Sequence, residues 1–250
     1  MKNSTLVVFT CLISLLNAST MCCAQDHFSR KDSLRGSLRT ERNYDVLHYD
    51  LDIAVDVESQ KIEGAVIMEF VPNQDLPAIQ MDLFENMNIQ HVLKGNRELK
   101  YRREYDAFFI ESEFKKGDKE KIKIVYSGKP KKALKAPWDG GFVWQKDAQG
   151  KPWVGLACEG AGASLWWPNK DHLSDEPDRG MDIHITVDHE LMAISNGQFI
   201  KTTDADKNHK TWHWHVSYPI NNYNVSLYIG DFAHIQDQYM SADSSLLQLD

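Results

Sequence analysis

The chain has 250 residues, of which 42% are hydrophobic and 26% are charged, and its seven Trp residues add bulk for a packed core. This composition excludes a disordered, collagen-like or low-complexity protein. With 28 Lys and Arg against 36 Asp and Glu, the formal charge is −8. That balance argues against a nucleic-acid-binding protein, because such proteins normally carry a basic surface. No span of about 20 apolar residues follows the N-terminal leader, so we predict no transmembrane segment after it.

The N-terminus has the three parts of a secretory signal peptide. A positively charged start is followed by an apolar run over residues 6–16 and by small residues up to Ala24. We therefore predict a signal peptide over residues 1–24 and an exported protein, either periplasmic or extracellular. A lipid anchor through Cys22 or Cys23 is less favoured, because the residues before them make a poor lipobox. Cleavage after Ala24 leaves 226 of the 250 residues and removes one Lys, so the formal charge becomes −9.

One cysteine remains after this cleavage. Three of the four cysteines precede residue 25, and Cys158 stands alone in the mature chain. An exported protein with a single cysteine has no internal disulfide framework. A lone cysteine is either a nucleophile or a small buried residue, and we predict the second role for Cys158.

Alternating hydrophobicity predicts that the mature chain is built from strands. Apolar residues, including Leu47, occupy the odd positions from 47 to 57, and this pattern is typical of a half-buried strand. A second strand over 61–71 follows a short link, which predicts a hairpin. Asn196-Gly197 predicts a tight turn, and no segment of the mature chain has a helical pattern. Further strands are predicted at 78–83, 87–93, 106–111, 119–126, 181–187, 190–195, 209–217 and 223–230. The fold class predicted is therefore all-β, as a β-sandwich.

Composition also predicts the boundaries within the mature chain. Residues 25–43 are polar and rich in charge, so we expect a flexible leader. Residues 44–240 form the predicted β-sandwich. Residues 241–250 end in an apolar run where a polar tail would normally close a domain, so we expect there the start of a truncated following domain.

Three short patterns resemble known sites, and each has a simpler explanation. His189-Glu190 opens a zinc-like H-E-x-x-H, but Ala193 takes the place of the second His, so we reject a zinc site. His213 and His215 share one face of a predicted strand, which suits a metal. Their alternation with Trp, however, fits Trp inward and His outward. The segment 160–164 lacks the Lys-Ser/Thr ending and the βαβ context of a phosphate-binding loop.

Residues 137–177 form the most unusual stretch of the sequence. It is rich in Gly, Trp and acidic residues. Glycines permit close approach of a ligand to the backbone, and aromatic and acidic side chains supply walls for a binding site. Two interpretations stay open from the residues alone: a ligand-facing loop region, or a structural loop stabilised by Trp packing.

An ordered series of motifs along the chain resembles a known family. The motifs are Tyr44-Asp45-Val46-Leu47-His48-Tyr49, Pro137-Trp138-Asp139-Gly140-Gly141, the block from Cys158-Glu159-Gly160 to Asp175-Glu176-Pro177, Ser195-Asn196-Gly197, and Ser217-Tyr218-Pro219-Ile220-Asn221-Asn222-Tyr223-Asn224-Val225. The sequence is similar, over about residues 44–239, to the N-terminal domain of the aminopeptidase N and leukotriene A hydrolase family of zinc metallopeptidases, especially its bacterial exported branch. The resemblance implies an all-β, saddle-like domain that covers a thermolysin-like zinc domain.

The resemblance also implies a substrate-binding segment made of Glu159, Gly160, Ala161 and Gly162. In that family a Gln or Glu on the loop before the D-E-P motif holds the free α-amine of a peptide substrate, and Glu159 occupies that position. A carboxylate in a partly desolvated pocket pairs well with an ammonium group. Such a contact selects peptides with a free N-terminus, because an internal amide carries no such charge.

The catalytic motifs of that family are absent from this sequence. It contains neither a G-A-M-E-N strand nor an H-E-x-x-H helix, which supply substrate contacts, zinc ligands and a general base. We therefore predict no catalytic residue and no metal ligand in this chain, which alone is inactive. Zinc is the expected cofactor of the full-length aminopeptidase, and a C-terminal catalytic domain is the expected missing partner. The alternative is a free-standing, non-catalytic β-sandwich binding module.

Overall fold

The computed structural model describes residues 28–36 and 39–249. The predicted signal peptide over residues 1–24 therefore lies outside the described residues. Contacts divide the chain into two units, Met1–Ser33 and Leu34–Asp250. Among the described residues, no helix combines the length and the apolar character that a membrane span requires.

A short helix, α2 (Arg30–Leu34), corrects the prediction that the mature chain has no helix. The backbone amide and the hydroxyl of Ser29 donate to the Asp32 carboxylate at 2.7 and 2.6 Å, and the Asp32 amide donates to the Ser29 hydroxyl at 3.3 Å. This reciprocal pattern is a capping box, which supports a helix start locally. Five residues are too few to show a helical period in the sequence.

Strands make up most of the remaining described chain. Their bounds are β1 (Tyr44–Asp56), β2 (Lys61–Pro72), β3 (Leu76–Asp82), β4 (Met87–Lys94), β5 (Arg97–Glu98), β6 (Lys100–Glu104), β7 (Ala107–Phe114), β8 (Glu120–Gly128), β9 (Gly141–Lys146), β10 (Pro152–Ala157), β11 (Met181–Asp188), β12 (Met192–Ser195), β13 (Gln198–Asp204), β14 (His209–Val216), β15 (Leu227–Gly230), β16 (Asp237–Met240) and β17 (Leu246–Leu249). Single 3-10 turns are η1 (Thr40–Arg42), η2 (Ala163–Leu165) and η3 (Asn222–Asn224).

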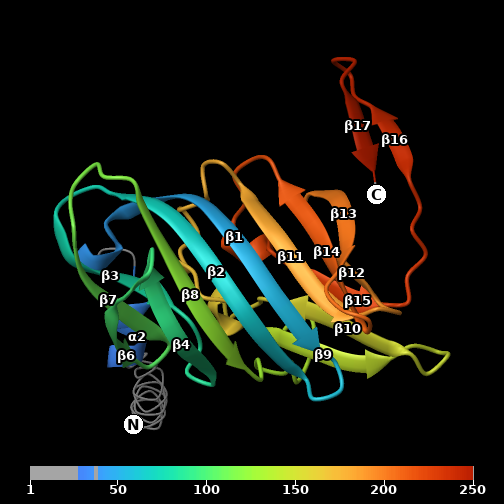
Figure 1. Ribbon diagram of the computed structural model, residues 1–250, viewed down its shortest axis with the longest axis horizontal. Helices are drawn as coiled ribbons and strands as arrows, with labels where there is room; N and C mark the ends of the chain where they lie inside the picture. The colour runs from blue at the N-terminus through green and yellow to red at the C-terminus, as the bar shows by residue number, and fades with distance from the viewer. Residues whose placement is uncertain (1–27, 37–38, 250) are drawn as a thin grey trace, which may run out of the picture. The chain divides into compact units, whose positions relative to one another are not determined.

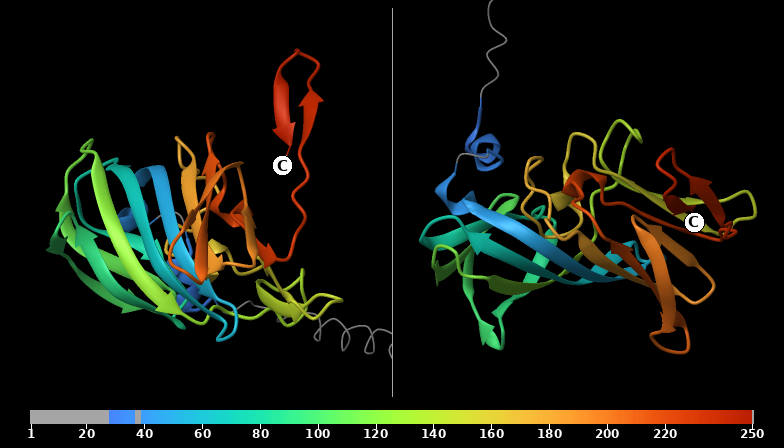
Figure 2. Two further views of the ribbon diagram at one scale, coloured as in Figure 1. Left: turned by 45° about the vertical axis from the view of Figure 1, so that its right-hand side comes forward. Right: turned by 90° about the horizontal axis from the view of Figure 1, so that it is seen from above.

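One large sheet and two smaller sheets enclose the core. The large sheet has the strand order β13-β14-β11-β1-β2-β8-β4-β5, in which β1 and β11 run parallel and β1 and β2 form the predicted antiparallel hairpin. Figure 1 shows β8, β2, β1, β11 and β14 side by side in this sheet, and Figure 2 shows it from above. The smaller sheets are β12-β15-β10-β9 and β3-β7-β6, and residues of all three sheets share one hydrophobic core. The predicted all-β sandwich is confirmed, and β16 pairs with β17 in a separate hairpin.

Strand β1 shows how alternation builds the core and where it fails. The inward side chains, each at most 4% exposed, are Tyr49, Leu51, Ile53 and Val55. A β-bulge between Val46 and His48 shifts the register, so Tyr44 and Val46 are buried N-terminal to it. The predicted inward place of Leu47 is wrong: this side chain is only half-buried. One inserted residue reverses the alternation, and a hydrophobic pattern alone does not reveal it.

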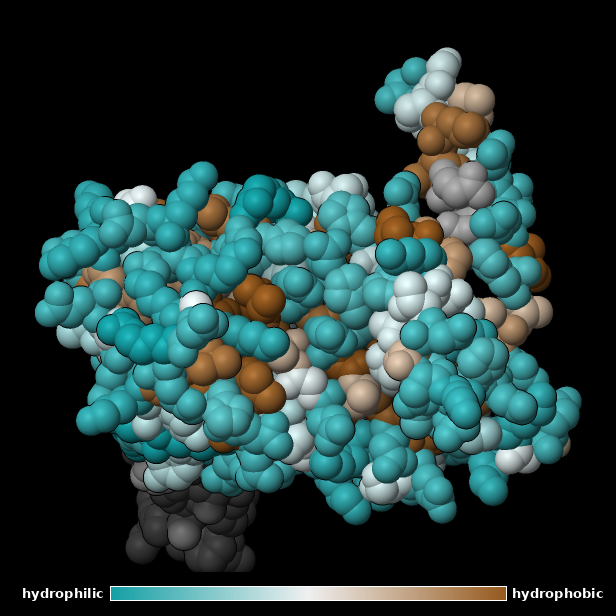
Figure 3. All heavy atoms as spheres, in the orientation of Figure 1, coloured by the Kyte–Doolittle hydropathy of each residue, from teal (hydrophilic) through white to brown (hydrophobic). Residues whose placement is uncertain are grey.

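The other face of the large sheet is mostly hydrophilic. Figure 3 shows hydrophilic residues predominating on the face that β1, β2 and β11 turn toward the viewer. On β14, Trp214 packs into the core and is 6% exposed. His213 and His215 alternate with it and are half-buried on the opposite face. The predicted arrangement of Trp inward and His outward is confirmed.

Several elements differ from the sequence pattern. Strands β9 and β10 both lie in the stretch 137–177, for which the sequence predicts a loop. The two strands pair with each other, and Phe142 stacks on Trp144 with 5.2 Å between the ring centres. The strand predicted over 223–230 begins only at Leu227, because η3 occupies the preceding residues. The strands β5, β6 and β13 are also unpredicted. The tight turn at Asn196-Gly197 is confirmed, with Gly197 at φ 87°, and it joins strands of two different sheets.

A buried ion pair ties the segment before β1 to the smaller sheet. Arg42 in η1 is 3% exposed and Asp82 at the end of β3 is 6% exposed. The Arg42 Nη2 atom donates to both Asp82 carboxylate oxygens, at 2.7 and 2.6 Å. Removing one member of such a pair leaves the other charge without compensation in a low-dielectric environment. The residues just before Tyr44 are therefore part of the folded structure.

Replacement of Arg42 by Met tests this pair. We expect Arg42→Met to lower the free energy of unfolding by about 3–5 kcal/mol, measured by urea denaturation, because the Asp82 carboxylate stays buried. The control is Lys61→Met, which breaks an ion pair with Glu63 whose side chains are 42% and 60% exposed. This control should change stability by less than about 1 kcal/mol. Equal losses in the two variants would contradict the assignment.

Candidate functional site

A tight turn after β10 carries the predicted substrate-binding segment. The carbonyl of Cys158 accepts hydrogen bonds from the amides of Ala161 and Gly162, at 3.0 and 2.8 Å. The turn requires positive φ angles of 65° at Gly160 and 85° at Gly162, which glycine adopts without strain. Cys158 is buried, as predicted, and burial raises the pKa of its thiol to about 12. Glu159 and Gly160 are exposed at the tip of the turn.

The carboxylate of Asp171 stabilises this turn through hydrogen bonds. Its Oδ2 atom accepts hydrogen bonds from the Ser164 amide and hydroxyl, at 3.1 and 2.6 Å. A Cβ atom added to Gly162 would lie 2.2 Å from the same oxygen, so only glycine fits there. The Asp171 amide in turn donates to Asp82 Oδ2 at 3.1 Å, and Arg42 donates to the Asp171 carbonyl at 3.4 Å. The turn is thus connected to the buried Arg42–Asp82 pair.

A second buried charge, on Lys170, fixes the next part of the loop. Its ammonium group donates to the Asp175 carboxylate and to the Tyr44 carbonyl, and it lies 4.6 Å from the centre of the Tyr44 ring. Burial lowers the pKa of Lys170, and the Asp175 carboxylate opposes that shift. Asp175 is the first residue of the predicted D-E-P motif, and it also accepts a hydrogen bond from the Val46 amide at 3.4 Å. The motif therefore locks the loop to β1.

The turn η3 meets Glu159 from a distant part of the sequence. The buried Asn222 donates to the Lys170 carbonyl at 3.0 Å, and the Asn221 side chain accepts from the Tyr223 amide at 3.0 Å. These contacts present the Tyr223 hydroxyl, which donates to Glu159 Oε2 at 2.5 Å. This hydrogen bond raises the pKa of Tyr223. The sequence pattern did not identify Tyr223 as a site residue, although it lies in the last motif of the resemblance.

The four predicted residues lie together, and they differ in accessibility. Glu159 and Gly160 are exposed, whereas Ala161 is 6% exposed and its carbonyl accepts a hydrogen bond from Arg35 at 2.8 Å. The partly desolvated pocket expected around Glu159 is not formed by the described residues. The reason is that the turn lies at the end of a strand with its tip in solvent. These residues therefore present an exposed carboxylate on a turn that hydrogen bonds hold in place.

The other histidine and acidic candidates give no metal centre within the described residues. In that part of the chain no three side chains of His, Cys, Asp or Glu gather in a way that could hold a metal ion. The described residues therefore offer no set of ligands that fits zinc. His213 instead contacts His184, with 2.8 Å between their Nδ1 atoms, and His215 contacts Asp182 at 2.7 Å. His189 and Glu190 form a turn between β11 and β12 rather than a helix.

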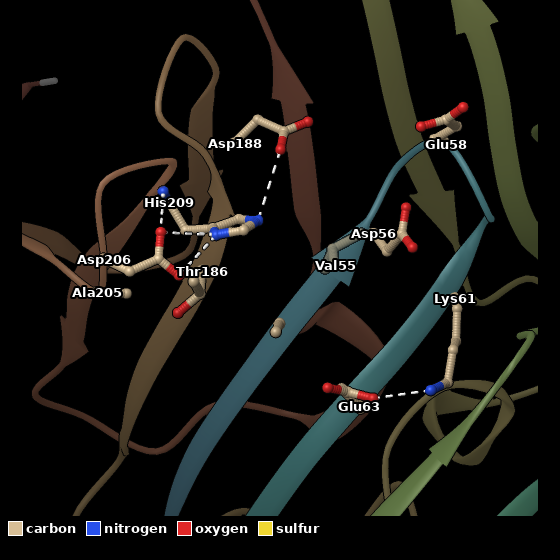
Figure 4. A pocket seen from close by; sticks show the side chains of 11 residues that line it. Val55, Asp56, Glu58, Lys61, Glu63, Thr186, Asp188, Ala205, Asp206 and His209 are labelled. Carbon is tan, nitrogen blue, oxygen red and sulfur yellow. Dashed lines mark hydrogen bonds and ion pairs between the residues drawn. The ribbon is translucent and has the colours of Figure 1, made fainter.

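A separate cavity of about 520 Å³ lies beside the ends of β1, β2, β11 and β14. Figure 4 shows His209 in its wall between two acids. The His209 ring lies 2.9 Å from Asp206 and 3.7 Å from Asp188. Glu63 pairs with Lys61 at 2.8 Å in the same wall. None of its lining residues belongs to the segment 157–178, so this cavity is distinct from the turn that carries Glu159.

Comparison with known families and structures identifies the fold. The profile of the Peptidase M1 N-terminal domain matches residues 45–223. No curated protein sequence matches the chain.

Solved structures of M1 peptidases share the fold. A variant of an M1 zinc metallopeptidase from Deinococcus radiodurans, bound to the substrate Tyr-Ser-Ala, superposes with a TM-score of 0.68 at 20% identity. The match covers 83% of this chain and 47% of that one, so the present chain spans about half of its length. Native yeast LTA4 hydrolase gives a TM-score of 0.61 at 18% identity, over 81% of this chain and 30% of that one. At such identities the likeness shows the fold alone.

Two glycines of the turn provide a test of how the site is braced. Both have positive φ, but a Cβ atom at Gly160 meets nothing within 4 Å, whereas one at Gly162 meets Asp171 at 2.2 Å. We expect Gly160→Ala to lower the free energy of unfolding by about 1 kcal/mol, the cost of a left-handed backbone. Gly162→Ala should lower it by about 3 kcal/mol, because the clash adds to that strain. Similar losses in thermal or urea unfolding would contradict the role given to Asp171.

Proposed function

Because the chain belongs to the Peptidase M1 N-terminal domain family, we propose that it forms the substrate-anchoring part of an exported zinc aminopeptidase. That enzyme removes N-terminal residues from peptides. The observation that carries the proposal is the Glu159 carboxylate, exposed on a turn that buried groups hold in place. Its position before the D-E-P motif is also the one at which the family binds the substrate amine.

The chemistry of Glu159 suits a free peptide N-terminus. A carboxylate and an α-ammonium group form a charge-assisted hydrogen bond, which is stronger than one between neutral groups. An internal peptide bond has no positive charge at that point, so the contact favours removal of residues from the chain end. The exposed Gly160 beside it lets a ligand approach the backbone closely. The Deinococcus radiodurans metallopeptidase variant was solved with Tyr-Ser-Ala and a two-domain M1 zinc metallopeptidase variant with L-tryptophan, and both of these ligands carry a free α-amine.

A partner domain completes the site in this proposal. Glu159 is exposed in this chain, and a catalytic domain packed against the turn would remove water from it. Desolvation would strengthen the attraction between the carboxylate and the ammonium group. That domain would also hold the zinc, since the described residues of this chain contain no group that fits a metal.

The leader supports the exported part of the proposal. Residues 1–24 have the charged start, apolar run and small-residue end of a signal peptide. The enzyme would then act in the periplasm or outside the cell.

The chain by itself is expected to lack peptidase activity, because the sequence has no H-E-x-x-H motif. The test is hydrolysis of leucine p-nitroanilide by the purified chain with added zinc, with and without a chelator. No turnover above buffer is the expected result. Turnover that the chelator abolishes would contradict the proposal that zinc and catalysis belong to the partner domain.

The role of Glu159 is tested in the whole aminopeptidase that carries this domain. We expect Glu159→Ala to weaken substrate binding by about 2–4 kcal/mol, seen as a higher KM for leucine p-nitroanilide, because one partner of a desolvated charge pair is lost. Glu113→Ala is the charge-matched control, since Glu113 is an exposed acid on β7. Its KM should equal that of the wild type. Unchanged KM and kcat in Glu159→Ala would remove Glu159 from the site.

A further inference from the structure

The hydrogen bond between Tyr223 and Glu159 connects two loops that are 64 residues apart in the sequence. We propose that Tyr223 is a positioning residue that fixes the Glu159 carboxylate in the orientation that receives the substrate amine. The inference rests on the proposed function. It adds to the site a residue of η3, which lies outside the turn after β10 that carries Glu159.

The geometry leaves one carboxylate oxygen for a ligand. The Tyr223 hydroxyl donates to Oε2 of Glu159 at 2.5 Å. Within the part of the chain that the structure describes, no hydrogen bond or ion pair reaches the Oε1 atom, so this oxygen can receive the ammonium group. Glu is a flexible side chain, and on an exposed turn it would otherwise sample many rotamers. Immobilising such a side chain before the substrate arrives removes an entropic cost from binding.

Both ends of this contact are themselves held in place. The Glu159 carbonyl accepts a hydrogen bond from the Gly140 amide at 2.8 Å, which fixes the backbone of the turn. On the other side, Asn222 is 1% exposed and donates to the Lys170 carbonyl at 3.0 Å, while Asn221 caps the Tyr223 amide. Tyr223 is therefore presented from a turn that hydrogen bonds hold in place, although the residue is 36% exposed.

The chemical type of the donor also fits a positioning role. A phenol is uncharged, so it orients the carboxylate without neutralising it. A Lys or Arg at this place would compete with the substrate ammonium for the same negative charge. Two basic side chains that contact the segments beside Glu159 are engaged with other groups: Arg35 donates to the Ala161 carbonyl, and Lys131 forms an ion pair with Asp139.

A double-mutant cycle in the whole aminopeptidase separates positioning from a purely structural role. We expect Tyr223→Phe to raise the KM for leucine p-nitroanilide about 3- to 10-fold, the range that corresponds to ordering one flexible side chain, with kcat within about twofold. In the Glu159→Ala background the same substitution should have no further effect, because Tyr223 acts through Glu159. Tyr228→Phe is the matched control: Tyr228 on β15 is 40% exposed, close to the 36% of Tyr223, and its KM should not change.

The outcomes distinguish this inference from the proposed function. A KM that is unchanged in Glu159→Ala would overturn the proposed function. A higher KM in Glu159→Ala together with an unchanged KM in Tyr223→Phe would overturn only the positioning role. If Tyr223→Phe raises KM equally in the wild type and in the Glu159→Ala background, that result would also overturn only the positioning role.

A second measurement on the full 250-residue chain checks the contact without any catalysis. The hydrogen bond to Glu159 raises the pKa of Tyr223. We expect Glu159→Gln to lower this pKa toward that of an ordinary tyrosine, followed by NMR titration of ¹³Cζ-labelled tyrosine, because the charged acceptor is gone. A Tyr223 pKa that does not respond to Glu159→Gln would overturn the positioning role even if Glu159 proves to bind the amine.

Discussion

A buried ammonium group, that of Lys170, holds together the part of the fold on which the candidate site depends. The residue is 7% exposed, and such a charge is tolerated in a protein interior only when its hydrogen-bonding capacity is met. The Asp175 carboxylate and the Tyr44 carbonyl bind the ammonium group, and the Lys170 amide donates to the Tyr49 hydroxyl at 3.0 Å. The Lys170 carbonyl accepts from Asn222. One residue thus joins β1, the long loop and η3.

This arrangement explains how an exposed side chain is placed with precision. Binding residues commonly lie on loops that a rigid scaffold positions. Here the scaffold is the sandwich, and the loop is tied to it through Lys170 and through Asp171, which braces the turn at Ser164. Both sets of contacts end near Glu159. Those of Asp171 hold the backbone of its turn, and those of Lys170 hold η3, whose Tyr223 contacts Glu159. In the proposed enzyme the sandwich supplies orientation, and a partner domain supplies desolvation and zinc.

Much of the fold follows from the sequence, because alternation is a local signal. The odd-position pattern and the short link between the runs predict the strand pair β1 and β2. They do not predict the bulge beside Leu47, since one extra residue leaves no trace in hydrophobicity. The sequence pattern does not reveal strand β9, because its Gly and Trp residues depend on pairing with β10.

The candidate site was predictable only in part. The resemblance assigned Glu159 directly, and the Gly residues around it indicated a turn. The contacts of Arg42 with Asp82 and of Tyr223 with Glu159 join residues 40 and 64 positions apart. Such pairings are set by tertiary structure, and a single sequence carries no local signal for them.

The most direct test of the central claim is a crystal structure of the whole aminopeptidase with a bound peptide. The account predicts that the α-nitrogen of the peptide lies about 2.7–2.9 Å from a carboxylate oxygen of Glu159, the range of a charge-assisted hydrogen bond. Tyr223 should hold the other oxygen. A peptide whose α-nitrogen is bound elsewhere, with Glu159 turned toward solvent, would contradict it.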